Sequence, residues 1–434
     1  MIPARRLAAL LALWGALALA AAVFAAALPF WLGAGALIAV VAAIDAVAVL
    51  RRPSPDCERE VAGTLALGVW TGVRLRVHNP GAKPVALEIF DGVPPQLAAR
   101  AMPASVRIDA HGWADIAYEV RPLERGQFCF APADARLASP WGLWQRARAL
   151  GEKQCIRVYP NFAAVAHYAL LATDNHLSTI GIRLRQRRGQ GLDFHQLREY
   201  RQGDSLRQVD WKATSRVGKV IAREYQDERD QQVVFLIDCG RRMHAKDGEL
   251  SHFDHALNAV LLLSYVALRQ GDAVGLMAFA GDTRFLPPAK GAGQLNRVLD
   301  TVYDLQAGLA TPDYRAAASS VLARLKKRSL VIVVSNLRDE DDAELPPALQ
   351  SLRRKHLVLF ASLRERALTE TRDKPVETFD DALAHSAALI YLAERQQTHD
   401  TLQASGTFCL DVEPQGLPVA LVNRYLEIKR SGRL

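Results

Sequence analysis

Polar side chains that could hold a ligand follow two of the most apolar runs of the chain. Residues 232–237 are apolar after the first and end at Asp238, and residues 330–335 run into Asn336. Short, continuous apolar runs are typical of central parallel strands, which are buried on both faces. Ligands of such sheets lie at the carboxyl ends of the strands. The sequence therefore places a candidate site at Asp238, Ser335 and Asn336.

Common catalytic motifs are missing from the sequence. It has no G-x-x-x-x-G-K-[ST] phosphate loop, no H-E-x-x-H zinc motif and no G-x-S-x-G nucleophile motif. His252, Asp254 and His255, with His244 nearby, are residue types that bind transition metals. His and Asp at a helix entry are more often capping or solvent-facing residues. We therefore expect no catalytic residue, and we expect the chain not to be an enzyme.

Composition and cysteine usage narrow the class of protein. The chain has 434 residues, of which 50% are hydrophobic and 23% charged, as in ordinary folded proteins, with a net charge of +8. The cysteines are odd in number and widely spaced, and no C-x-x-C occurs: Cys57, Cys129, Cys155, Cys239 and Cys409. This spacing argues against a zinc ribbon or a dense disulfide framework. We expect reduced thiols in a cytoplasmic setting.

The N-terminal residues predict a transmembrane hairpin over residues 1–52. Residues 7–28 and 31–50 are almost entirely apolar, and each run is long enough to cross about 30 Å of hydrocarbon as a helix. The alternative is a cleaved signal peptide. The length of the first run and the second run directly behind it favour the hairpin.

The flanking charges predict the orientation of the hairpin. Arg5 and Arg6 precede the first run, Arg51 and Arg52 follow the second, and the turn between has no charge. Positive residues stay inside, so we expect a multi-pass protein of a bacterial inner membrane with both termini and the soluble domains in the cytoplasm. Asp45 is expected to reach the interface or pair with the nearby arginines, or else to contact another membrane subunit.

Residues 57–160 predict an antiparallel, Ig-like β-sandwich. Segments such as 73–77 and 85–89 alternate between apolar and polar side chains and are separated by turns rich in Gly, Pro and Asn. Residues 139–144 form a turn with two tryptophans, expected to pack against the sandwich or to offer a contact surface.

Residues 231–434 predict a doubly wound α/β domain, because apolar strands alternate with amphipathic helices. The expected strands are 232–237, 273–279, 330–335, 356–362 and 407–412. The expected helices are 253–270, 295–305, 314–327, one near Asp380, and 417–429.

Residues 161–230 form a basic segment. From Arg183 to Arg223 there are 11 Arg or Lys against four Asp or Glu. A basic stretch can grip phosphates. The interleaved acids favour intramolecular pairing or protein docking instead, and we expect no nucleic-acid partner.

Two features resemble known families. A strand ending in Asp238, a long helix, and a second strand running into residues 279–282 resemble a von Willebrand factor A domain. The basic segment also contains three strings: Arg198-Glu199-Tyr200-Arg201-Gln202-Gly203-Asp204, Arg207-Gln208-Val209-Asp210-Trp211-Lys212-Ala213-Thr214 and Arg223-Glu224-Tyr225. Together they resemble the signature of the bacterial family called domain of unknown function 58, and the order of the domains also matches that family. The resemblance implies work beside a MoxR-type AAA ATPase, in assembling or activating protein complexes, and implies no enzymatic activity.

A von Willebrand factor A domain usually binds Mg²⁺ through Asp-x-Ser-x-Ser, a Thr and a second Asp. Here Asp238 is kept, Gly240 and Arg242 replace both serines, Asn336 stands at the second Asp position, and Thr311 is the candidate threonine. A hard cation loses oxygen ligands and gains neighbouring guanidinium groups. We expect no metal and no other cofactor. Asp238 is then expected to pair with an arginine, or Arg242 to receive a carboxylate of a partner directly.

The signature segment is the expected partner surface. Asp204 is expected to cap a helix over residues 205–214 whose apolar face docks on the body of the protein. The residues expected to meet an acidic partner are Arg201, Arg207, Trp211, Lys212 and Arg242. The sequence thus predicts a membrane-tethered adaptor or assembly factor. A metal-dependent adhesion-type receptor is the alternative, and a hydrolase is the weakest reading.

Overall fold

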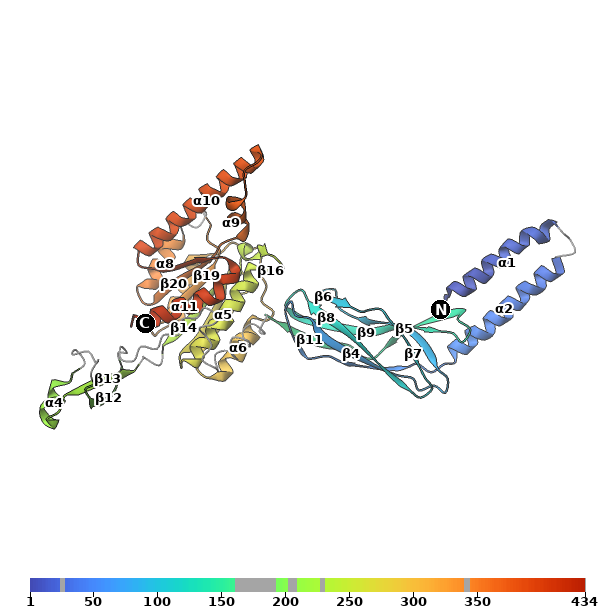
Figure 1. Ribbon diagram of the computed structural model, residues 1–434, viewed down its shortest axis with the longest axis horizontal. Helices are drawn as coiled ribbons and strands as arrows, with labels where there is room; N and C mark the ends of the chain where they lie inside the picture. Colours follow the sequence, from blue (N-terminus) through green and yellow to red (C-terminus); the bar gives the residue numbers. More distant parts are fainter. Residues whose placement is uncertain (24–27, 161–192, 202–208, 227–230, 339–343, 434) are drawn as a thin grey trace. The chain divides into compact units, whose positions relative to one another are not determined.

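The fold comes from a computed structural model that describes residues 1–23, 28–160, 193–201, 209–226, 231–338 and 344–433 (Figure 1). The chain divides into two compact units, Met1–Tyr159 and Pro160–Leu434. Each unit is described by itself.

Two helices begin the first unit, α1 (Arg5–Val23) and α2 (Leu28–Leu50). They lie side by side, and the rings of Trp14 in α1 and Trp31 in α2 stack with centroids 4.5 Å apart. Among the described residues, α2 is the helix that is long and apolar enough to cross a membrane.

The rest of the first unit is β-rich, as predicted, and forms two sheets. A seven-stranded sheet contains β1, β3, β5, β7, β9, β10 and β11, and a four-stranded sheet has the order β2-β4-β8-β6. Apart from the parallel pair β3–β11, the strands pair antiparallel. The strands are β1 (Ile2–Pro3), β2 (Asp56–Glu60), β3 (Thr64–Ala66), β4 (Thr71–His78), β5 (Val85–Gly92), β6 (Leu97–Arg100), β7 (Ala104–Ile108), β8 (Trp113–Pro122), β9 (Gly126–Ala138), β10 (Trp144–Leu150) and β11 (Gln154–Tyr159).

A buried ion pair joins the two sheets. Arg59 in β2 donates to the Asp91 carboxylate in β5 with Nε–Oδ2 2.8 Å, and the Tyr118 hydroxyl in β8 donates to the same carboxylate. Asp91 is fully buried, so these donors replace the water that it loses. Burial, and then the neighbouring Asp91 carboxylate, raise the pKa of the Tyr118 hydroxyl.

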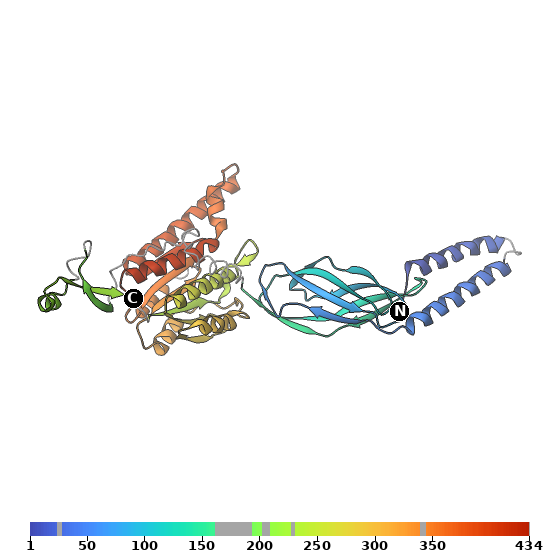
Figure 2. The same ribbon diagram turned by 60° about the horizontal axis from the view of Figure 1, so that its bottom comes forward.

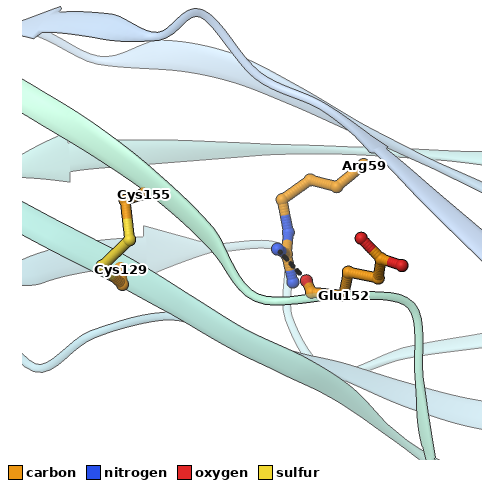
Figure 3. Close-up of a disulfide and its surroundings, with 4 residues drawn as sticks. All are labelled: Arg59, Cys129, Glu152 and Cys155. Carbon is orange, nitrogen blue, oxygen red and sulfur yellow. Dashed lines mark hydrogen bonds between the residues drawn. A yellow bond between two sulfur atoms is a disulfide. The ribbon is translucent and has the colours of Figure 1, made fainter.

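The expectation of reduced thiols is wrong for two cysteines. Cys129 and Cys155 are directly opposite each other on β9 and β11 and form a disulfide, with Cα atoms 3.9 Å apart (Figure 3). The alternation of the strands points the neighbouring Phe130 and Ile156 into the core and leaves the bridge on the outer face of the sheet. Sequence spacing could not show that the two strands are in this register.

The second unit is built on a six-stranded sheet, which confirms the predicted alternation of strands and helices. The sheet order is β18-β17-β14-β19-β20-β21, and only the edge strand β18 is antiparallel to its neighbour. The strands are β14 (Gln232–Asp238), β17 (Ala273–Phe279), β18 (Phe285–Ala289), β19 (Leu330–Ser335), β20 (Leu357–Leu363) and β21 (Phe408–Val412). The α-helices are α5 (His252–Arg269), α6 (Ala292–Val302), α7 (Tyr314–Arg324), α8 (Leu345–Arg353), α9 (Arg366–Asp373), α10 (Phe379–Ala404) and α11 (Leu417–Arg430).

Both faces of this sheet are covered, as its continuous apolar strands require. Val233, Phe235 and Ile237 of β14 belong to one core with α5, α6 and α11. The alternate residues Val234 and Leu236 belong to a second core, with α7 and α8. Figure 2 shows these helices, in yellow to red, packed around the sheet.

A small lobe precedes this sheet in the chain. The strands β12 (Asp193–Glu199) and β13 (Ile221–Gln226) pair antiparallel, and helix α4 (Trp211–Val217) lies between them in sequence. The unit also contains the short hairpin β15 (Lys246–Asp247) and β16 (Leu250–Ser251) and the 3-10 turns η4 (Arg241–His244) and η6 (Pro414–Gly416).

Candidate functional site

The candidate site lies where the sheet changes direction of winding. From β14 the chain adds β17 on one side and β19 on the other, so the carboxyl ends of β14 and β19 form the switch point at which such sheets bind ligands. Asp238 ends β14, and Ser335 ends β19. The structure thus brings the first two predicted residues together.

Protein donors satisfy the Asp238 carboxylate. One oxygen accepts the Gly240 N–H at 2.7 Å, and the other accepts the Ser335 hydroxyl at 2.6 Å. Ser335 is also 2.9 Å from the Tyr314 hydroxyl. Asp238 and Ser335 are fully buried. This carboxylate is therefore part of the internal framework rather than an open ligand.

Position 240 has no room for the serine of a metal loop. A Cβ added at Gly240 would lie 2.7 Å from the Ala310 carbonyl oxygen and 2.9 Å from Asp238 Oδ1. The Ala310 carbonyl also accepts the Arg241 N–H at 3.0 Å, which holds the two loops side by side. Thr311 is exposed on the second loop. Among the described residues, no group of three or more His, Cys, Asp or Glu is arranged to hold a metal ion.

Asn336 points into a separate polar network. Its Nδ2 donates to Glu365 at 2.9 Å, and its Oδ1 accepts from Arg395 of α10 at 3.3 Å. His252 Nδ1 lies 3.5 Å from the same Nδ2, and its Nε2 lies 3.1 Å from Asp247. Burial lowers the pKa of His252 despite the nearby carboxylates. Asn336 therefore joins helices and strands rather than facing a ligand.

Arg395 holds the ends of three strands. Its guanidinium donates to the carbonyls of Leu337 and Leu363, to the Ser362 hydroxyl and, at 2.7 Å, to Asp411 at the end of β21. Arg395 is itself buried. Arg395 could not be singled out from the sequence, because nothing distinguishes it from the other charged residues of its helix.

The prediction that Arg242 receives a partner's carboxylate is wrong for this conformation. Arg242 lies in η4 and is 3% exposed, because the turn after Gly240 rotates it inward. The exposed arginine of the turn is Arg241, and Leu309 on the neighbouring loop is 84% exposed. The rim of the sheet therefore presents Arg241, Leu309 and Thr311 to solvent.

The lobe places three of the predicted partner residues on its surface. Trp211 is 69% exposed, and Lys212 and Arg201 are exposed as well. Arg207 and Asp204 lie outside the described residues. Helix α4 begins at Trp211, because the Asp210 carboxylate accepts the N–H groups of Lys212 and Ala213 at 3.0 Å and so caps it, and residues 205–208 of the predicted helix lie outside the described residues.

Comparison with known proteins gives one family match. The model of the family described as "Protein of unknown function DUF58" matches residues 196–388, which include part of the lobe and most of the α/β sheet. No curated protein matches the chain.

Similar solved structures overlap only partly. A Salmonella alpha-2-macroglobulin reacted with methylamine is 21% identical with a TM-score of 0.20, over 24% of this chain and 7% of its own. An aerotolerance-related membrane protein from Bacteroides fragilis is 16% identical with a TM-score of 0.28, over 45% of this chain and 98% of its own. The chain thus spans a small part of the macroglobulin. At such low TM-scores none of these overlaps bears on its fold or function.

Proposed function

We propose that this chain is a membrane-tethered adaptor or assembly factor that binds a cytoplasmic protein partner through its lobe. The observation that carries the proposal is the exposure of Trp211 beside Lys212. Trp and Arg are the residues that most often dominate the binding energy of protein interfaces. A tryptophan that is more than two-thirds exposed on a folded surface favours a partner.

The construction of the lobe supports a docking role. Helix α4 has no buried residue, and Val217, Val220 and Leu197 are exposed, although Ile221 and Ala222 of β13 are buried. A lone two-stranded hairpin is marginally stable in water, and exposed apolar patches of this kind mark interaction sites. The basic residues Arg201 and Lys212 favour an acidic partner surface.

The partner that we propose is a MoxR-type AAA ATPase, following the resemblance of the signature segment. We further propose that residues 1–52 form a two-span hairpin, that residues 57–160 form an Ig-like sandwich, and that residues 231–434 form a von Willebrand factor A-like domain. In that domain, the exposed residues Arg241, Leu309 and Thr311 at the carboxyl end of the sheet offer a second contact surface. The arginines that flank the hairpin favour a cytoplasmic body.

The Cys129–Cys155 bridge is the observation that opposes a cytoplasmic body, since disulfides persist mainly in oxidising compartments. A reporter fused after the C-terminal residue in living cells decides the compartment. Cytoplasmic activity supports the proposal. Periplasmic activity would remove the ATPase as a partner and leave the adaptor role to be tested with periplasmic proteins.

The partner surface is tested by affinity purification in mild detergent, with and without ATP and Mg²⁺, of the wild type and of Trp211→Ala, Arg201→Glu and Lys212→Glu. Loss of a hot-spot tryptophan should weaken the affinity for the partner by about 30-fold. Trp113→Ala and Lys153→Glu change exposed residues of the first unit and serve as controls.

The melting temperature separates docking from folding. Weaker capture of the ATPase with an unchanged melting temperature supports an interface at the lobe. Weaker capture that only follows a lower melting temperature would reduce the segment to a structural element, and equal capture by all variants would exclude it from the interface.

A further inference from the structure

The end of α2 is fastened to the turn between β9 and β10. Asp45 is fully buried, and its carboxylate accepts the backbone N–H groups of Trp141 at 3.1 Å and Leu143 at 3.2 Å, and the hydroxyl of Ser139. The expectations that Asp45 pairs with arginines or with another membrane subunit are therefore wrong. Sequence separation of almost one hundred residues hid this contact.

Further bonds make the junction rigid. Trp144 Nε1 donates to the Ala42 carbonyl at 2.9 Å, and Arg146 donates to the Leu50 carbonyl at 2.8 Å, which caps the last turn of α2. The N-terminus joins the same sheet, because Ile2 and Pro3 pair with Gln145 and Trp144 of β10. The helices and the tip of the β sheets therefore move together rather than about a flexible linker.

This junction fixes the depth of the turn. The backbone of Trp141 bonds to residue 45, five residues before the end of α2 at Leu50. At 1.5 Å per residue, the turn lies about 8 Å inside the end of the helix. Trp141 is 50% exposed there. If α2 crosses a bilayer, the turn lies at the depth of the headgroups, where tryptophan is enriched.

Four arginines lie near this end of the two helices, Arg6 at the turn and Arg51 and Arg52 just beyond the end of α2. Arg5, Arg6 and Arg51 are exposed and Arg52 is partly so, and no ion pair among the described residues engages them. Arg6 lies at the turn, donating to the Trp141 carbonyl at 3.4 Å. Residues 1–55 contain these four arginines and a single acid, the buried Asp45. The junction is therefore cationic as well as aromatic.

We propose that this junction collar, defined as Arg5, Arg6, Arg51, Arg52 and Trp141, binds anionic phospholipid headgroups. The proposal rests on the membrane anchoring proposed above. The collar offers cations for the phosphates and an amphipathic ring for the boundary between headgroups and acyl chains. The occupant is a lipid rather than an acidic protein, because the collar lies at one end of an apolar helix long enough to cross a membrane.

The test uses the full chain in nanodiscs that contain phosphatidylcholine brominated at acyl positions 6 and 7. The fluorescence lost on Trp141→Phe reports Trp141 alone, and that component should be quenched. Trp70→Phe is the matched control, because Trp70 lies at the opposite end of β4 from the helix junction. The Trp141 substitution keeps the backbone bonds to Asp45, so the melting temperature should not change.

The preference of the chain for anionic over zwitterionic lipids tests the role of the arginines. After mild delipidation, native mass spectrometry should show phosphatidylglycerol retained over phosphatidylcholine, and Arg5→Gln/Arg51→Gln should reduce that preference by up to about fivefold per arginine. Arg74→Gln, an exposed arginine of β4, is the control and should leave it unchanged.

Two different failures are distinguishable. A chain that a carbonate wash extracts from membranes would overturn the membrane anchoring itself. A chain that resists extraction but shows an unquenched Trp141, or equal retention of both lipids, would overturn only the lipid-binding collar.

Discussion

Replacement of Arg395 by methionine should destabilise the α/β unit strongly. The substitution keeps a long apolar stem and removes the guanidinium, which donates to the carbonyls of Leu337 and Leu363, to Ser362 and to Asp411. These acceptors belong to three strand ends, and Arg395 of α10 donates to all three. Methionine removes this buried donor from all four acceptors, and weaker contacts remain, such as Tyr391 to the Leu337 carbonyl at 3.5 Å and Arg364 to Asp411 at 3.6 Å.

The expected cost follows from that burial. Removal of one partner of a buried, hydrogen-bonded ion pair costs about 3–5 kcal/mol. For a unit of this size, each kcal/mol corresponds to about 2–4 °C. We therefore expect the transition of the α/β unit to fall by about 6–20 °C, with little change in the transition of the β-rich unit.

Differential scanning calorimetry of the full chain in detergent measures both transitions. Arg366→Met is the matched control, because Arg366 pairs with Glu370 at 2.7 Å on the exposed surface of α9. Such a pair contributes little, and its loss should shift the transition by less than about 2 °C. The reasoning is refuted if Arg395→Met shifts the transition no more than Arg366→Met does.

Three further predictions concern thiols, pH and metal. In denaturant without reductant, three of the five cysteines should react with a thiol reagent, and all five after reduction of the Cys129–Cys155 bridge; five at the outset would contradict the bridge. Burial lowers the pKa of His252, so the unfolded chain takes up its proton first. Stability should be complete above the ordinary pKa of about 6.5 and decline as the pH falls toward the folded pKa, by at most about 1.4 kcal/mol per pH unit for this group. The melting temperature should therefore fall less between pH 7 and pH 5 in His252→Gln than in the wild type, and equal falls would remove His252 as a cause. Calorimetry with Mg²⁺ should show no stoichiometric uptake, and Gly240→Ser should not create it because Ala310 occupies the space; micromolar binding by the wild type would revive the receptor alternative.

Much of the second unit could be predicted, because each element carries its own periodicity. The strand ending at Asp238 is continuous and apolar, and the helix that follows begins at His252 with a Ser251 cap, within one residue of its predicted start. The edge strand β18 was missed, since its two prolines are unusual in a strand and are tolerated at an edge.

The contacts of the candidate site could not be predicted in the same way. A single 3-10 turn directs the Arg242 side chain inward, and the donors to Asp45 belong to a loop far along the chain. Asp210 caps α4, a role that the sequence could not assign to it, because aspartates are equally good caps by type and the chain has several in this segment. Local sequence patterns predict the helices and strands, whereas the contacts of Arg242, Asp45 and Asp210 depend on which loops the fold brings together.

The position of the Cys129–Cys155 bridge has a mechanical consequence. β11 is the last strand of the first unit, so any pull exerted by a partner on the second unit enters the β sheets at Tyr159. The covalent link to β9 stops the strand from peeling beyond Cys155. Tension can then detach only the four residues that follow the bridge, whereas in the reduced protein the whole strand resists by hydrogen bonds alone. Oxidation of this cysteine pair would thus determine how many residues of β11 can detach from the sheet, and so how far the connection between the two units can lengthen under tension.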